Sequence, residues 1–432
     1  MLCPADANLV ERDPGLPGLG TILDPDRFLE TVQGLYPQAG VTRVEPDYVR
    51  YKRTTSCLVG YRVSCAAGTV PVYARAHDMN GAKIAKAGRH AGAATPLGGG
   101  VTVLPGAAVA VYPFPNDHEL KLLSRLIGAE TRHGMLQEML PDRPDLWDAP
   151  LETLRYKPER RYVARLGADK THAAVLKLYT REAFGITGHN AGRFASDPPL
   201  CVPRRLCRSK AHRAAAVEWI EGVPLREAMA RSAVPEESFR AIGAALARLH
   251  GQKPHRLRRF STAQGFAELL IDGATALAEI APDTADRAQR LARRIGDKLT
   301  SRHWRARRAI HGDFSADQVI LQDGGIGIVD FDRAGKGEPR LDLGMFRARL
   351  EYDVICGGLA PDRVDACFEP MLDEYRRASD KDITRKLDRF AGACLLLIAA
   401  EPFRRRLPQW PEKIAAIVAA AERITAGREP AA

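Results

Sequence analysis

The stretch AIHGDFSADQVILQDGGIGIVDFDRAGKGEPRLDLG, residues 309–344, decides the fold of this chain. An apolar approach ends in the HGD motif at 311–313, and two short runs rich in β-branched residues then flank an Asp-Gly turn. Asp-Gly between such runs is a strong signal for a β-hairpin. We therefore predict one strand over 319–321 and a return strand over 326–329, which delivers the DFD motif at 330–332.

The turn can centre on Asp-Gly or on the Gly-Gly that overlaps it, so two registers are open. The first places Gln318 opposite Val329, and the second places it opposite Phe331. Both registers leave Gln318 within one residue of Asp330. The hairpin therefore brings an amide oxygen and a carboxylate together at its open end.

Asp313 lies in the loop just before this hairpin. Oxygen ligands of this kind suit Mg²⁺, which usually keeps several waters and is completed by substrate phosphates. Phosphoryl transfer needs such a metal, together with a group that orients the attacking hydroxyl. The pattern favours Asp313 for the hydroxyl, and Gln318 with Asp330 for the metal.

This segment resembles the aminoglycoside phosphotransferase and choline kinase-like family, small-molecule relatives of the protein kinases. The signature of that family is HGDxxxxN followed by a DF- or DW-type metal-binding segment, and His311, Gly312, Asp313 and Asp330 match it. The resemblance implies an α+β fold of the bilobal, protein kinase-like type, with a small antiparallel β-rich N-lobe and a helical C-lobe. It also implies ATP as the donor, Asp313 as the catalytic aspartate and Asp330 as the principal Mg²⁺ ligand.

Gln318 departs from the family pattern, in which most members carry Asn. Gln has the same amide oxygen on one more methylene, so it can still coordinate a metal. Maltokinases, which belong to the wider family and carry an extra N-terminal cap domain, are similar in having Gln there. The substitution favours a sugar kinase with an N-terminal α+β cap. Asp342 resembles the family's structural aspartate at the start of a helix, while His250 and His311 are interpreted as packing or loop-stabilising residues.

The family places a lysine for the α- and β-phosphates on a strand of the small sheet, and Lys177 in AAVLKLY fits that role. A snorkelling lysine on an edge strand is the alternative. The family's glutamate partner of this lysine is not evident: either Glu182 serves from a distorted helix start, or the ion pair is absent. The hairpin tip PERR would bring Arg160 and Arg161 near the triphosphate, although a solvent-exposed role for this pair is equally open.

Adenine would be held by backbone groups of the connection between the lobes. The resemblance places that connection at 218–222, so we expect Glu218 and Ile220 to bind the nucleotide. Asp332 is less certain in role. In an extended DFD segment it would face the same side as Asp330, because positions i and i+2 of a strand share a face. It could then bind metal or substrate, or it could form a salt bridge with Arg333, Lys336 or Arg340.

The composition is that of an ordinary globular protein, with 45% apolar and 27% charged residues. The 64 Lys and Arg exceed the 53 Asp and Glu by 11, and such a surface should attract phosphate-bearing partners. We interpret the arginine-rich segment 287–308 mainly as solvated helix faces. Nucleic-acid binding through these helices is an unlikely alternative, and it would predict an affinity that falls steeply with salt.

No apolar run approaches the roughly 20 residues that a membrane helix requires. The N-terminus shows no positively charged segment followed by an apolar one, so no secretory signal is expected. The eight cysteines form no CxxC and no zinc-type pairing with histidine. We therefore expect reduced thiols, no membrane span and a cytoplasmic protein.

The length of 432 residues suggests two or three domains. We predict a cap domain over 1–145, an N-lobe over 146–223 and a C-lobe over 224–426, with the catalytic segment at 309–344. A weak repeat supports the first boundary: VRYKRTTSCLVGYRV and LRYKPERRYVARL both begin with Arg-Tyr-Lys. The cap could therefore repeat the hairpin of the N-lobe, with Arg75 at the place of Lys177.

The function predicted from these residues is transfer of the γ-phosphate of ATP to a hydroxyl of a small polar molecule, most plausibly a sugar, an amino sugar or an aminoglycoside. A pseudokinase-like nucleotide-binding or scaffold module is the alternative, because the glutamate is missing and Gln318 is unusual. The acceptor cannot be read from the chain. Acidic residues that follow the catalytic segment would suit an amine-bearing acceptor, but they would look the same on ordinary surface helices: Glu351, Asp353, Asp362 and Asp365.

Overall fold

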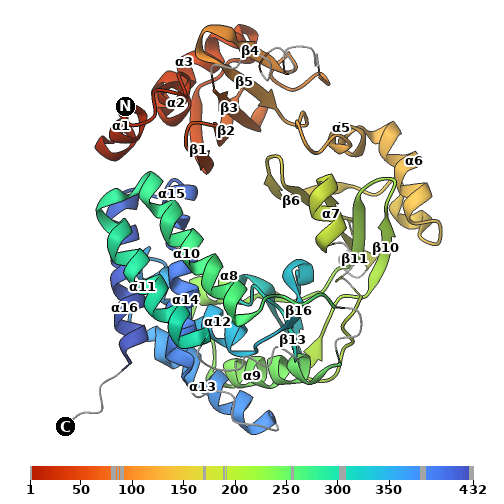
Figure 1. Cartoon of the computed structure of the whole chain (residues 1–432). Helices are drawn as coiled ribbons and strands as arrows, with labels where there is room; N and C mark the ends of the chain where they lie inside the picture. Colours follow the sequence, from red (N-terminus) through yellow and green to blue (C-terminus); the bar gives the residue numbers. More distant parts are fainter. Residues whose placement is uncertain are drawn as a thin grey trace.

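The computed structural model describes residues 2–78, 84, 87, 92–168, 172–187, 190, 192–253, 257–300, 308–379 and 386–427. Figure 1 shows three parts arranged around a common centre: an N-terminal sheet with its helices, a second sheet, and a large helical part that reaches the C-terminus. Part of the predicted arginine-rich segment, 301–307, lies outside the described residues.

The N-terminal part, residues 2–113, begins with helices and continues as an antiparallel sheet of order β1-β2-β3-β5-β4. Asp24 caps its longest helix by accepting the N–H of Asp26 at 3.0 Å, and Pro25 fits the first helical position. Its elements are α1 (Pro4–Glu11), α2 (Leu19–Leu23), α3 (Pro25–Leu35), η1 (Pro37–Ala39), β1 (Arg43–Lys52), β2 (Ser56–Cys65), β3 (Gly68–His77), β4 (Thr102–Leu104), η2 (Pro105–Ala107) and β5 (Val109–Pro113).

The second sheet has the order β10-β11-β8-β7-β6. Residues of β7 alternate between buried and half-buried, as expected for a strand with one face in a core. That core holds Tyr162, Leu176 and Leu178 together with apolar residues of α5 and α6. The elements are α5 (Leu123–Ile127), α6 (Ala129–Met139), η3 (Pro144–Leu146), β6 (Leu151–Lys157), β7 (Arg161–Leu166), β8 (Ala174–Tyr179), α7 (Arg181–Thr187), β10 (Arg205–Ser209) and β11 (Ala214–Glu218).

The division at residue 145 stays a prediction. Helices α5 and α6 precede it in the chain, yet their buried side chains, among them Leu123 and Leu136, belong to the core of the second sheet.

The helical part is built on pairs of packed helices. Helix α9 packs against α13, and Gly243 allows the close approach, because a Cβ there would lie 2.1 Å from the carbonyl oxygen of Met371. The helices are α8 (Leu225–Arg231), α9 (Glu236–Gly251), α10 (Ala263–Ile280), α11 (Pro282–Thr300), α12 (Arg340–Ile355), α13 (Arg363–Ala378), α14 (Leu387–Leu397), α15 (Glu401–Arg404) and α16 (Trp410–Ala426).

The catalytic segment lies where the second sheet meets the helical part (Figure 1). One small sheet has the order β12-β14-β15-β9, and β13 pairs with β16 in another. Their bounds are β9 (Leu200–Cys201), β12 (Val223–Pro224), β13 (Arg308–Ile310), β14 (Val319–Gln322), β15 (Gly325–Ile328) and β16 (Gly335–Gly337), with the 3-10 turns η5 (Ala316–Gln318) and η6 (Phe331–Arg333). A β-rich lobe and a helical lobe thus flank this segment, which is the bilobal α+β arrangement expected from the sequence.

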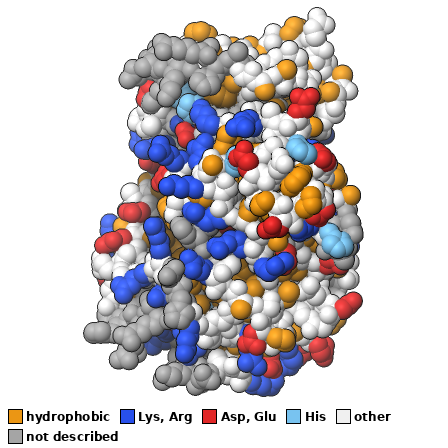
Figure 2. All heavy atoms as spheres, turned by 90° about the vertical axis from the view of Figure 1, so that its right-hand side faces the viewer, with side chains coloured by type: hydrophobic (Ala, Val, Ile, Leu, Met, Phe, Trp, Pro, Cys, Tyr) orange, Lys and Arg blue, Asp and Glu red, His pale blue; other side chains and the backbone are white. Residues whose placement is uncertain are grey.

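The surface is unevenly charged. Figure 2 shows Lys and Arg side chains gathered in a band along one side of the face that it presents. Among the described residues, no helix is both long enough and apolar enough to cross a membrane.

Candidate active site

The hairpin β14–β15 adopts the first of the two predicted registers. Val319 pairs with Ile328, and the N–H of Val329 donates to the carbonyl oxygen of Gln318 at 3.0 Å. Asp330 follows at once in the left-handed conformation, with φ 64°. The strand end therefore places Gln318 and Asp330 beside each other, as the turn chemistry predicted.

The loop that carries Asp313 is held by buried polar groups. The carboxylate of Asp342, at the start of α12, accepts the N–H of His311 at 2.6 Å and the N–H of Gly312 at 2.8 Å. The same carboxylate lies 2.9 Å from His250 Nε2, and His250 Nδ1 lies 2.9 Å from the hydroxyl of Tyr375. His250 and Asp342 are both buried, so their role in this geometry is to fix the loop.

Gly312 is required at its position by two constraints. Its φ is 79°, a conformation that L side chains rarely adopt. A Cβ there would also lie 2.4 Å from the carbonyl oxygen of Arg333. His311 is fully buried, and its Nε2 lies 2.8 Å from the carbonyl oxygen of Val329, so it ties the loop to the end of the hairpin.

Asp313 is half-buried. Within the part of the chain that the structure describes, its carboxylate has neither a hydrogen-bond donor nor an ion-pair partner. Asp313 is among the charges that act on the Lys157 amine and on the Arg349 guanidinium, so it lies between the second sheet and the helical part. A carboxylate left open in this way can accept a proton from a substrate hydroxyl.

Lys177 reaches the catalytic segment, and so does Arg161, one of the two arginines expected at the hairpin tip. Lys177 Nζ donates to Asp330 at 2.5 Å and to Asp332 at 3.1 Å. Arg161, on the neighbouring strand, donates to Asp332 at 2.8 Å and to Asp330 at 3.2 Å. The hydroxyl of Tyr179 donates to Asp332 at 3.0 Å.

These contacts set the protonation of the pair. Burial alone would raise the pKa of Asp330, but Lys177 and Arg161 together hold that pKa well below its usual range. Burial alone would likewise lower the pKa of Lys177, but Asp332 and Asp330 raise it. Both side chains are therefore charged at neutral pH.

The expectation of an extended DFD segment is wrong. The left-handed conformation of Asp330 and the 3-10 turn η6 place Asp332 by a different path. The expected salt bridges from Asp332 to Arg333, Lys336 or Arg340 are replaced by the contacts with Lys177 and Arg161. Lys177 and Arg161 nevertheless each contact both Asp330 and Asp332.

The lysine–glutamate ion pair is absent among the described residues. Glu182 lies in the first turn of α7 with its side chain exposed, and Lys177 pairs only with the two aspartates. Asn190 supports the aspartate segment instead, donating to the carbonyl oxygens of Asp332 at 3.3 Å and Ala334 at 2.8 Å. No sequence signal marked Asn190, whereas Tyr179 could have been found from its i+2 relation to Lys177.

The two arginines of the hairpin tip have different surroundings. Arg160 is exposed, whereas Arg161 pairs directly with Tyr179 across the sheet and reaches the aspartates. Lys157 pairs with Arg161 in the strand register, so its side chain lies on the same face of the sheet. Arg155, two residues earlier, shares that face. The face that meets the catalytic segment is therefore strongly basic.

Burial and the neighbouring Arg155 and Arg161 lower the pKa of Lys157 to about 8, although Glu401 and Asp313 act in the opposite direction. A folded-state pKa below the unfolded value means that the charged form costs stability below pH 8. This cost is relieved as the pH rises toward the unfolded value of about 10.4.

We expect Lys157→Met to raise the melting temperature at pH 7, with a difference that shrinks by pH 10. Lys52→Met, at an exposed lysine, should show no such pH dependence, and equal differences for Lys157→Met at both pH values would contradict the assignment.

The connection between the lobes leaves backbone groups open. The N–H of Glu218 donates to the carbonyl oxygen of Arg204 at 2.9 Å, and the N–H of Trp219 donates to Ala173 at 3.1 Å. Ile220 has no backbone hydrogen bond within the described residues, so its N–H and C=O are available to a ligand. The Glu218 carboxylate pairs with Arg204 at the surface, which leaves only its backbone for nucleotide recognition.

Three of the four acidic residues expected to line an acceptor pocket are paired with arginine. Arg226 donates to Asp353 at 2.9 Å and also pairs with Asp317. Arg347 lies 3.5 Å from Glu351 and 3.2 Å from Asp365. Asp362, the fourth residue of the expected acidic pocket, is exposed before α13. Three of these four carboxylates thus have an arginine partner, and each of the two arginines is shared with another carboxylate.

A family model described as the phosphotransferase enzyme family matches residues 152–376. The chain belongs to this family. Its fold is therefore the protein kinase-like fold of that family, and the protein is a small-molecule kinase. The matched region begins in β6 and ends in α13, so it contains Lys177, the catalytic hairpin and Asp342.

Solved structures of small-molecule kinases resemble the chain in fold. A choline/ethanolamine kinase family protein from Mesorhizobium loti has 16% identity and a TM-score of 0.48, with 70% of this chain and 95% of that chain covered. Choline kinase from Cryptosporidium parvum Iowa II has 10% identity and a TM-score of 0.47, covering 69% and 96%. A glucosamine kinase has 18% identity and a TM-score of 0.43, covering 65% and 82%. At such identities the likeness concerns the fold and not the substrate, and no curated protein matches the sequence.

Proposed function

We propose that this kinase transfers the γ-phosphate of ATP to a hydroxyl of a small polar molecule, most plausibly a sugar or an amino sugar. One observation carries the proposal. The unpartnered carboxylate of Asp313 lies on the loop that Asp342 fixes, and it directly precedes a hairpin whose Asp330 receives Lys177 from the opposite lobe. A base for the acceptor and a phosphate-binding cation thus lie on the two sides of one site.

The residues beside the hairpin end fit Mg²⁺. Asp330 and Asp332 supply carboxylate oxygens, and the amide of Gln318 makes no hydrogen bond within the described residues, so its oxygen is free to coordinate. Such hard oxygen donors are the ligands that Mg²⁺ prefers. When bound with a nucleotide, the ion neutralises negative charge on the β- and γ-phosphates.

The chain's own residues take the remaining roles. Asp313 orients the acceptor hydroxyl and accepts its proton, as a positioned carboxylate can. Lys177 binds the α- and β-phosphates once the nucleotide draws it from the aspartates. Arg161, which already contacts Asp330 and Asp332, binds the phosphates, and the exposed Arg160 keeps only a peripheral role. The open backbone groups of Ile220, with the backbone of Glu218, recognise the adenine.

The charge of the helical part favours a sugar over a polycationic aminoglycoside. An acceptor with several ammonium groups needs unpaired carboxylates, but Asp353 and Asp317 already bind Arg226. The basic face that includes Lys157 would also repel such an acceptor. A sugar-kinase role agrees with the Gln at position 318 and with the proposal that residues 1–145 form a cap.

A pseudokinase-like binding module is the second candidate. It is favoured by the absence of a glutamate partner for Lys177 and by the occupation of Asp330 by two cations. The two candidates differ in turnover, because a binding module would take up nucleotide without acceptor-dependent release of ADP.

The decisive experiment measures Mg²⁺-dependent ADP release with a panel of neutral sugars, amino sugars, aminoglycosides and choline-like alcohols. We expect release to depend on a sugar or amino sugar, and Asp330→Asn to lower kcat about 100-fold or more, because the Mg²⁺ that would neutralise the phosphates loses a carboxylate ligand. Asp323→Asn, in the exposed turn of the same hairpin, is the matched control and should leave kcat unchanged. Equal rates for Asp330→Asn and the parent would refute the site.

A further inference from the structure

The tip of the hairpin β6–β7 is bound to the N-terminal part by buried ion pairs. Glu159, at this tip, has only 1% of its side chain exposed. Both of its carboxylate oxygens lie 2.7 Å from Arg75 Nη1 of β3, and Arg50 of β1 pairs with the same carboxylate. A buried carboxylate is stable only when it is fully paired in this way.

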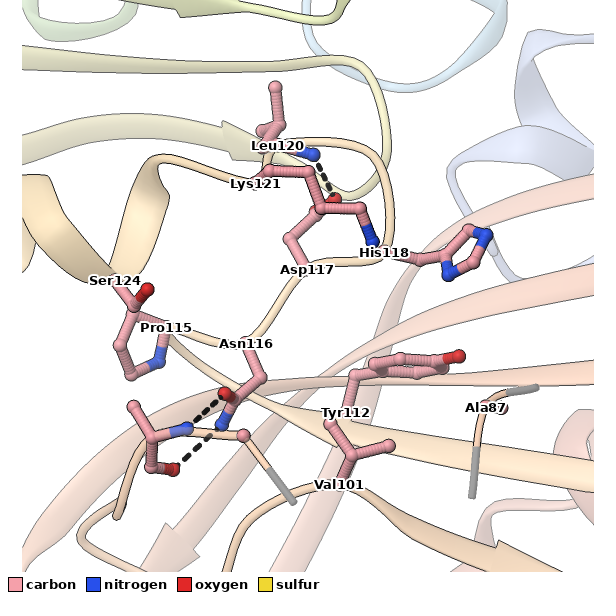
Figure 3. Close-up of a pocket in the computed structure, with 12 residues that line it drawn as sticks. Ala87, Val101, Tyr112, Pro115, Asn116, Asp117, His118, Leu120, Lys121 and Ser124 are labelled. Atoms are coloured by element: carbon pink, nitrogen blue, oxygen red, sulfur yellow. Dashed lines mark hydrogen bonds between the residues drawn. The ribbon is translucent and has the colours of Figure 1, made fainter. Parts of the chain in front are cut away.

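A second carboxylate holds the tip from the loop that joins the N-terminal part to α5. Asp117 accepts the N–H of Glu159 at 2.8 Å and the hydroxyl of Tyr156 at 2.7 Å. Its other oxygen accepts the N–H of Leu120 at 2.8 Å, drawn in Figure 3 beside a cavity of about 230 Å³. In the same view, the amide of Asn116 bonds the backbone of Ala93, so this loop is itself fixed.

The two five-stranded sheets have equivalent arrangements of strands. Their strand orders correspond, with β1-β2-β3-β5-β4 in one and β6-β7-β8-β11-β10 in the other. The registers place four residues of each sheet in equivalent rows: Arg50, Leu58, Arg75 and Ala110 in the first, and Arg155, Val163, Lys177 and Ala215 in the second. Arg75 thus occupies in the N-terminal sheet the place that Lys177 occupies in the second sheet.

The N-terminal part is also tied to the helical part. Arg406, just after α15, donates to Asp6 of α1 at 3.0 Å through Nη1 and also through Nη2, and both side chains are buried. Asp330 belongs to that helical part. The N-terminal part therefore bridges the lobe that carries the hairpin tip and the lobe that carries the aspartates.

We propose that the N-terminal part positions the phosphate-facing hairpin over Asp330, with Glu159 as the positioning residue and the Arg50–Arg75 pair as its receptor. The proposal rests on the proposed function, because it assigns the hairpin to the nucleotide's phosphates. β6 is an edge strand whose residues 152–155 are exposed, so no neighbouring strand restrains its outer side. Without these contacts, Arg161, two residues after Glu159, would lose its fixed position against the aspartates.

The test compares Glu159→Gln with the parent full-length chain. We expect the KM for MgATP and the Kd for MgADP to rise about tenfold or more, since a small misplacement of binding groups costs that much, while kcat at saturating nucleotide changes little. Arg75→Gln should have a similar effect, Glu159→Gln should add little to it, and Arg75→Lys should rescue part of the loss. Glu119→Gln, an exposed glutamate beside Asp117, is the matched control.

Hydrogen exchange separates this inference from the proposed function. The N–H groups of Arg160 and Glu159 are bonded in the tip, and we expect them to exchange about tenfold faster in Glu159→Gln while the amides of β14–β15 stay protected. Unchanged tip exchange, or faster exchange with unchanged nucleotide affinity, overturns the proposal. A parent chain that neither binds MgADP nor transfers phosphate refutes the proposed function. Hydrogen exchange at the tip then still tests whether the N-terminal part orders the hairpin. If Glu159→Gln fails to fold, Arg50→Gln, which removes one partly exposed contact, takes its place.

Discussion

Asp313→Asn is expected to lower kcat for phosphate transfer by about 10²–10⁴-fold, the usual contribution of a positioned general base. Asparagine keeps the size of the side chain but cannot accept the hydroxyl proton. The affinity for nucleotide should change little, because the contacts of Lys177 with Asp330 and Asp332 do not involve Asp313. Steady-state kinetics with the acceptor found in the panel, together with calorimetric titration of MgADP, measure both quantities.

The control for this variant is Asp362→Asn, an exposed aspartate before α13 that makes no capping hydrogen bond. It should match the parent in kcat and in KM. Near-parental transfer by a folded Asp313→Asn chain would show that Asp313 is not the base of the reaction.

Asp342→Ala is expected to lower the free energy of unfolding by about 3–5 kcal/mol, because it leaves buried donors without their charged acceptor. The N–H groups of His311 and Gly312 and the ring of His250 all lose their partner at once. Urea unfolding, followed by far-UV circular dichroism, gives the difference between variant and parent.

Two comparisons make this second prediction specific. Tyr375→Phe removes only the outer hydroxyl of the network and should cost about 1 kcal/mol. Asp362→Ala, at an exposed position before α13, should cost less than about 0.5 kcal/mol. A cost for Asp342→Ala no larger than that of Asp362→Ala would show that the buried carboxylate does not support the catalytic loop.

The catalytic hairpin could be predicted because its pairing is local. An Asp-Gly turn between two β-branched runs selects the strands, and the structure differs from the predicted bounds by one residue at three strand ends. The same turn places Gln318 beside Asp330, whichever register forms. Asp313 needed only its position in the HGD motif, because the loop between it and the hairpin is short.

Asp332 shows where a local rule failed. The i and i+2 relation holds for an extended strand, but Asp330 adopts a left-handed conformation and the next residues form a 3-10 turn. That bend depends on the lobe above it, because Lys177 and Arg161 bind both carboxylates and Asn190 bonds the carbonyl oxygen of Asp332. A single segment read alone does not contain those partners.

The arginine of the hairpin tip shows the same limit. Arg160 and Arg161 are adjacent and chemically identical, so composition could not choose between them. In the observed strand register Arg161 pairs with Tyr179, and its side chain therefore lies on the face of the sheet that meets the aspartates. The burial of Glu159 could not be predicted from the sequence either, because its partners Arg75 and Arg50 lie 84 and 109 residues away in the chain.

The sequence by itself therefore determined the catalytic segment 309–344, the lysine on the small sheet and the family to which they belong. Turns and strand alternation act over a few residues, and the motif carries its own spacing. Only the tertiary structure decided which cations meet Asp330 and Asp332, that Glu351, Asp353 and Asp365 pair with arginine, and that the N-terminal part holds the hairpin tip. Those contacts join residues far apart in the chain, and they form only where packing of the two sheets and the helices brings opposite charges out of water together.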